Sequence, residues 1–145
     1  MTEMERRAAA TQACMDRFAG KPLIPGQRDC GTLAEHLLHR MGRKASLLRG
    51  ANHKTLAGAV RYIRRLGFCS LMELIDAELG IQPEDRIAPA SAWPADLIAL
   101  PSEEGDGFGC ALAVAIDGGR VLMPNVATGL FEPMTPHLFV TAWRV

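Results

Sequence analysis

The sequence lacks the features that would place it in a membrane or send it through one. Its longest uncharged apolar run, from Gly107 to Ile116, ends at Asp117, far short of the roughly 20 residues that cross a bilayer. We therefore expect no transmembrane helix. Residues 1–10 carry four charges and no long apolar stretch, so we also expect no signal peptide and synthesis in the cytoplasm.

The sequence also lacks closely spaced cysteines. Its four cysteines are separated by 16, 39 and 41 residues, whereas zinc and iron–sulfur sites usually contain a close pair. We therefore expect no metal and no cofactor, and we interpret most of the cysteines as buried free thiols. With 48% hydrophobic and 22% charged residues, the composition predicts one compact domain over residues 1–145.

The chain has no net charge, but its charges are unevenly distributed. Residues 1–66 contain 13 Lys+Arg against 5 Asp+Glu, and residues 67–145 contain 3 against 11, which gives +8 and −8. Such halves attract each other within a molecule or between molecules. We therefore expect contacts with copies of itself or with neighbouring proteins.

The first half of the sequence predicts helices. Four stretches have apolar residues at helical spacing, and each ends near a glycine. Capping residues precede three of them, namely Thr2, Asp29 and Ser70, and the remaining stretch runs from about Thr55.

The second half predicts strands, because its apolar segments are short and separated by turn residues. We expect strands at 96–100, 111–116, 120–123 and 138–144, with a tight hairpin turn at Asp117-Gly118-Gly119 and a turn leading into a strand at 129–131. Helices followed by strands predict an α+β domain, with the helical half packed on an antiparallel sheet.

Cys30 is the sharpest candidate for chemistry. It follows the predicted cap Asp29, and the first turn of a helix favours a thiolate by lowering the pKa of the thiol. The alternative is that Cys30 is a small residue buried under the start of the helix.

The residues around Cys30 resemble the nucleophile segment of the NlpC-type cysteine peptidases, papain-like enzymes that cut cell-wall peptides. The matching residues are Gly20, Pro22, Gly26, Asp29 and Cys30. The resemblance extends to a phage and prophage branch of this superfamily, a family of unknown function. It is carried by Arg49-Gly50, by Pro94-Ala95-Asp96 before a strand, and by Ala-Trp-Arg-Val at 142–145.

This resemblance implies a base, a residue that orients the base, and an aromatic residue near the oxyanion. Counting back from the predicted hairpin places these positions near Ala111, Met123 and Leu23, which are all apolar. Without a base, a factor of about 10² to 10⁴ in rate is lost. His36 and His39 lie about 9 and 13 Å along the helix axis from Cys30, so His137, before the final strand, is the alternative base.

A basic stretch is the second candidate site. No acidic residue occurs between Glu35 and Glu73, while this interval contains the possible anion-binding residues Arg61, Arg64 and Arg65. These arginines can bind an anionic polymer or an acidic neighbouring subunit. Tyr62 is the only aromatic residue of the basic run from Arg40 to Arg65, apart from histidine, and no helix-turn-helix motif is present, which argues against nucleic acid.

The resemblance implies a papain-like domain that keeps its nucleophile position and has lost its base. We expect a structural component of a phage or prophage tail tip or of tail assembly, present in the host cytoplasm during assembly and then in the virion tail. Its partners are other tail proteins or copies of itself. Two alternatives remain open: a peptidase or amidase that cuts peptidoglycan with Cys30, and a charge-driven anion-binding module.

Overall fold

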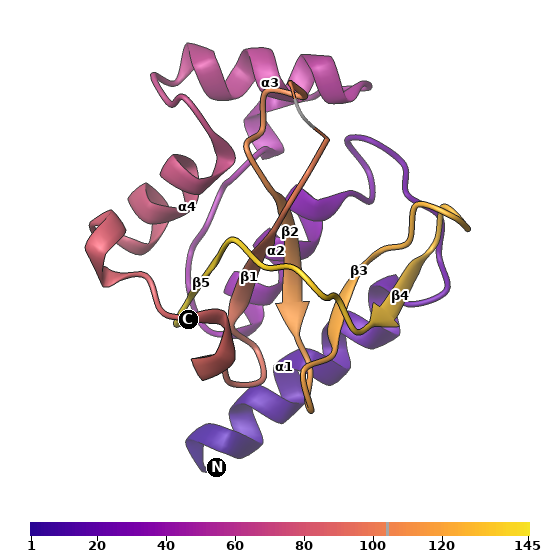
Figure 1. Ribbon diagram of the computed structural model, residues 1–145, viewed down its shortest axis with the longest axis vertical. Coiled ribbons are helices and arrows are strands. Elements are labelled where there is room, and N and C mark those ends of the chain that lie inside the picture. The colour runs from indigo at the N-terminus through magenta and orange to yellow at the C-terminus, as the bar shows by residue number, and fades with distance from the viewer. Residues whose placement is uncertain (104) are drawn as a thin grey trace.

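The computed structural model describes residues 1–103 and 105–145 (Figure 1). Its helices are α1 (Glu3–Phe18), α2 (Cys30–Arg40), α3 (Leu56–Arg65) and α4 (Leu71–Leu79), with short 3-10 turns η1 (Arg49–Ala51), η2 (Pro83–Asp85) and η3 (Pro89–Ser91). Its strands are β1 (Leu97–Leu100), β2 (Ala111–Ala115), β3 (Val121–Pro124), β4 (Phe131–Met134) and β5 (Thr141–Trp143). None of the described helices is both long enough and apolar enough to span a membrane.

The predicted caps Thr2, Asp29 and Ser70 are confirmed, and Thr55, near which the third helix was expected to begin, also acts as a cap. The side chains of Thr2, Asp29, Thr55 and Ser70 each accept a hydrogen bond from a backbone N–H in the first turn of the helix that follows. Such a bond satisfies one of the N–H groups that a helix leaves unpaired at its start. The start of every α-helix is thus determined by a local signal.

The strands form an antiparallel sheet in the order β4-β3-β2-β1-β5. The predicted hairpin joins β2 to β3, where Gly118 (φ +50°) and Gly119 (φ +80°) both adopt positive φ. Two such residues form the turn that matches the twist of paired strands. The expected α+β class with an antiparallel sheet is confirmed.

The two faces of the sheet pack against different partners. Leu33 and Leu37 of α2 are fully buried in one apolar cluster with Leu112 and Leu122 of the sheet. On the opposite face, Ile98 belongs to a second cluster that includes Ala113 and Val121. Figure 1 shows α2 behind the sheet and the yellow segment from β4 to β5 in front of it.

Two strands differ from the predicted ranges. β4 is the strand that the expected turn at 129–131 leads into, for which no range was predicted. It carries Pro133, which lacks a backbone donor and is tolerated in an edge strand such as this one. The predicted strand at 138–144 is ordered as a strand only at Thr141–Trp143, while Leu138, Phe139 and Val140 are exposed on the segment that crosses the sheet. The apolar run that predicted a longer strand therefore consists in part of exposed residues that are not in a strand.

Asp96 joins the two ends of the chain. Its buried carboxylate accepts hydrogen bonds from Arg7 Nη1 (2.9 Å), Arg144 Nε (2.8 Å), the backbone N–H of Trp93 (2.8 Å) and that of Val145 (3.0 Å). Arg7 is itself 2% exposed and also donates to the carbonyl of Val145. These partners compensate both buried charges, which are otherwise costly to remove from water.

Candidate functional site

Cys30, the nucleophile position that the sequence resemblance implies, is the first residue of α2. Asp29 caps this helix by accepting from the backbone N–H of Thr32 (2.9 Å), and its second oxygen accepts from the N–H of Gly26 (2.8 Å). In return, Thr32 Oγ1 accepts from the N–H of Asp29 (2.8 Å). The helix start and the preceding turn are therefore held together by one carboxylate.

The Cys30 thiol is not activated by this position. Burial raises its pKa to about 11, and the negative charge of Asp29 raises it further. Hydrogen bonds from the backbone of Leu112, of Gly31 and of Cys30 itself act in the opposite direction. The predicted lowering of the thiol pKa is therefore wrong, because desolvation and the adjacent carboxylate outweigh the backbone dipoles at the helix start.

The residues that face α2 from the sheet differ by one position from those counted along the sequence. Ala111 and Met123 pack on the far face, against the cluster of Ile98. Leu112 shares the cluster that contains α2, as does Cys110 just before the strand. Since side chains alternate along a strand, Leu112 and Cys110 lie on the side of α2, whereas Ala111, the position expected for the base, lies on the far face.

These places provide no base for Cys30. Leu112 is apolar, and burial raises the pKa of the Cys110 thiol to about 12. A negative charge on Cys30 would raise the pKa of Cys110 further, so the two thiols act on each other electrostatically. Two neighbouring thiols that both favour the protonated form cannot serve as nucleophile and base at neutral pH.

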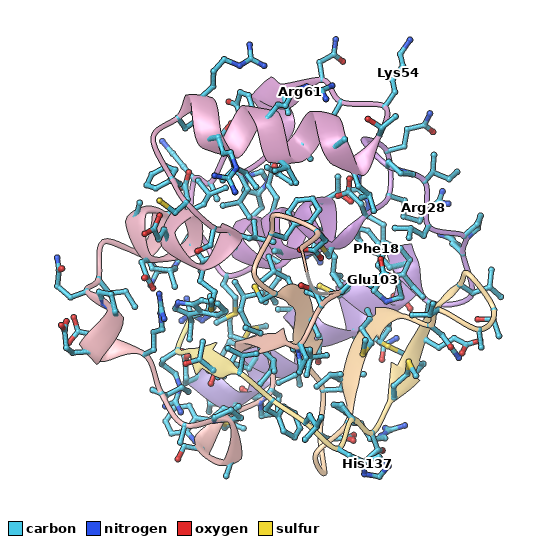
Figure 2. All side chains as sticks on the ribbon, turned by 45° about the horizontal axis from the view of Figure 1, so that its top comes forward. Phe18, Arg28, Lys54, Arg61, Glu103 and His137 are labelled. Atoms are coloured by element: carbon cyan, nitrogen blue, oxygen red, sulfur yellow. The ribbon has the colours of Figure 1, made fainter. Side chains whose placement is uncertain are left out.

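The structure does not bring His137 to Cys30. His137 is exposed in the segment between β4 and β5, and it projects from the lower edge of the molecule in Figure 2. Phe139 of the same segment lines a pocket together with Ile98 and Val121, which lie on the far face of the sheet. The sheet therefore lies between His137 and α2.

His53 forms a pair that sequence reasoning did not find. Its Nε2 lies 2.7 Å from Asp29 Oδ2, with side chains only 3% and 4% exposed. The ring thus donates to the same carboxylate that caps α2. His53 occurs in a loop 24 positions after Asp29, and no periodicity or turn pattern connects the two, so only the fold reveals the contact.

The basic stretch forms a surface on α3. Arg61, Arg64 and Arg65 are exposed, while Ala59 and Ile63 are buried beneath them. Figure 2 shows Arg61 on the helix at the top of the molecule, with Lys54 beside it. No carboxylate among the described residues forms an ion pair with the three arginines, which we call the basic face of α3; the side chain of Arg49 lies outside the described part.

Comparison with known proteins gives a family and a fold. Two solved structures from Trichomonas vaginalis are similar: NlpC1, with 14% identity and a TM-score of 0.59, and NlpC2, with 9% identity and a TM-score of 0.55. The two matches cover 99% and 96% of this chain, but this chain spans only 45% and 46% of the length of the two solved chains. At these identities the likeness shows the papain-like NlpC fold alone.

No curated protein matches the sequence. A family model described as "Domain of unknown function (DUF6950)" matches residues 2–145. Because this match covers nearly the whole sequence, the chain belongs to the DUF6950 family.

Proposed function

We propose that this chain is a non-hydrolytic domain with the NlpC fold and serves as a structural component of a phage or prophage tail tip or of tail assembly. The observation that carries the first part is the pair of residues facing Cys30 from the sheet, Leu112 and Cys110. Neither accepts a proton from the thiol at neutral pH. The location in a tail rests on the sequence resemblance to the phage and prophage branch.

The state of the thiol supports the absence of peptide cleavage. A cysteine peptidase requires a thiolate and a nearby acid to protonate the leaving amine. The pKa of Cys30 at about 11 leaves the thiol protonated at neutral pH. Loss of the base also removes the proton donor, since one imidazole performs both steps in a Cys–His pair.

A structural role agrees with the way Asp29 is used. In this chain the carboxylate beside the nucleophile position accepts three hydrogen bonds, from Gly26, Thr32 and His53. All three stabilise the protein itself. The Asp-Cys pair of the peptidase-like motif is thus explained in this chain by a structural role, because Asp29 begins a helix and holds two loops.

A second candidate function, an anion-binding module, is favoured by the basic face of α3. Three exposed arginines without a carboxylate partner among the described residues attract an anionic surface, and Arg65 also lies over the ring of Tyr62 at 6.0 Å. In a tail, the same face fits an acidic surface on a neighbouring subunit. Both uses depend on salt, because exposed charges are screened over about 10 Å at 0.1 M.

Genetic complementation tests the structural role. A prophage that lacks this chain is complemented with the wild-type sequence, with Cys30→Ala and with a triple Arg61, Arg64, Arg65→Gln variant, and tail completion is scored by electron microscopy. We expect Cys30→Ala to restore complete tails. Complete tails in the absence of the chain would contradict a role in tail assembly.

Hydrolysis is tested on the purified chain with muropeptides of defined stem peptide, followed by mass spectrometry of the products. We expect no cleavage by the wild type. Cleavage that disappears in Cys30→Ala would instead establish the peptidase or amidase alternative. Parallel assays of His53→Ala and His137→Ala would then identify the base.

A further inference from the structure

A polar pocket lies apart from Cys30, along the side of α2 that carries Thr32, Glu35, His36 and His39. Its volume is about 260 Å³, and three of the four histidines of the chain line it, together with Arg17 of α1. Cys30 does not line it. The only apolar side chain of branched or aromatic type in its wall is Leu48, so the pocket is suited to a polar ligand.

The walls of the pocket are held in place by Asp29. Its carboxylate accepts hydrogen bonds from the turn at Gly26, from the first turn of α2 and from His53, whose loop closes the pocket. Gly26 (φ +83°) permits this arrangement, because a Cβ there would lie 1.9 Å from the carbonyl oxygen of His53. The pocket is therefore preorganised, which reduces the cost of ordering it on binding.

The hydrogen-bond partners determine which ring nitrogen carries the proton in two of the pocket histidines, His36 and His39. Arg17 Nη1 lies 3.3 Å from His36 Nδ1; a guanidinium only donates, so Nδ1 accepts and a neutral His36 carries its proton on Nε2. His39 Nε2 donates to the carbonyl of Ala45 at 2.7 Å. The other N–H groups of Arg17 donate to no acceptor among the described residues, which leaves them for a ligand.

The charges around His36 favour an anion. Its pKa is lowered by burial and then by the positive charges of Arg17, Arg40 and His39. A group that feels several positive charges lies in a positive potential. Glu35 also lines the pocket, with Oε1 at 3.9 Å from His39 Nε2, so the anion belongs at the Arg17 end.

We propose that this pocket binds a small molecule through an oxyanion group, a carboxylate or a phosphate, with the Arg17 guanidinium as its main contact and the exposed amides of Gln27 and Asn52 as further donors. Planar guanidinium groups bind both oxyanions in a bidentate manner. The site is independent of Cys30 and of the basic face of α3.

The test follows the imidazole resonances of the pocket histidines by NMR during titration with sodium phosphate, sodium acetate and, as a salt control, sodium chloride. Three proteins are compared: the wild type, Arg17→Gln, and Arg64→Gln, which loses the same charge on α3. We expect saturable shifts of His36 and His39 with phosphate, acetate or both, and about ten-fold weaker binding in Arg17→Gln. Arg64→Gln should bind like the wild type.

The two anion titrations distinguish a phosphate site from a carboxylate site, because the anion that the site prefers saturates it at the lower concentration. Equal shifts with chloride, equal affinity in the two variants, or no shift with either oxyanion would overturn the proposal. Arg17 is exposed on the last turn of α1, so its replacement leaves the fold intact. Resonances of His137 and of the backbone that are the same in Arg17→Gln as in the wild type verify that the variant is folded.

Discussion

The reactivity of Cys30 toward an alkylating reagent gives the sharpest test of the site. The thiol has a pKa of about 11 in the folded protein, compared with 9.0 for an unperturbed cysteine. Since only the thiolate reacts, two pH units correspond to about a 100-fold smaller reactive fraction near neutral pH. Restricted access to the partly buried sulfur slows the reaction further.

The assay is a timed pulse of iodoacetamide followed by peptide mass spectrometry. Cys69 is exposed and reports in the same sample that the reagent is active. We expect Cys30 to react about 100 times more slowly in the folded protein than in urea, and its rate to increase about ten-fold for each pH unit between neutral pH and pH 9. If Cys30 reacts as fast as Cys69 in the folded protein near neutral pH, the thiol is activated and the reasoning against a peptidase fails.

Three further predictions concern stability and assembly. Arg7→Met leaves the buried Asp96 without one of its partners and should lower the free energy of unfolding by about 3 kcal/mol. Arg6→Met breaks only an exposed ion pair with Glu3 and should leave the stability almost unchanged; urea denaturation that shows equal effects would contradict this. Burial raises the pKa values of Cys14 and Cys110 from 9.0 to about 12. Above pH 9 the unfolded chain therefore binds fewer protons than the folded one, and stability should fall by about 1.4 kcal/mol per pH unit for each thiol, with a shallower fall in Cys110→Ala. The opposite charges of the two halves should cause association at low salt that reverses when salt is added, and sedimentation that shows a monomer without a partner at low salt would refute it.

Local signals in the sequence predicted most of the fold. The caps Thr2, Asp29 and Ser70 and the Asp117-Gly118-Gly119 hairpin are short-range patterns, and the structure contains all of them. The turn at 129–131 indicated that a strand follows, but Pro133 weakens the strand pattern there, and the extent of β4 depends on its pairing with β3. The apolar run at 138–140 predicted a strand where the structure has none.

The candidate site was less predictable because it depends on register and on contacts between distant segments. A shift of one residue moves a side chain to the other face of a sheet, which is why counting indicated Ala111 although Leu112 faces α2. The expectation for the Cys30 pKa used only the helix start, whereas burial by the folded chain decides the direction. The contact between His53 and Asp29 has no sequence signal at all.

The junction at Asp96 has a consequence for the order of folding. Arg7 and Val145 meet there across 138 positions of sequence, and a contact that closes so long a loop forms late because the entropy of the intervening chain must be lost first. Until that step, α1 has neither its buried ion pair nor its contact with the carboxyl-terminal residues. A chain shortened before Trp143 should therefore remain open and sensitive to proteases, with its first helix among the earliest segments to be cut.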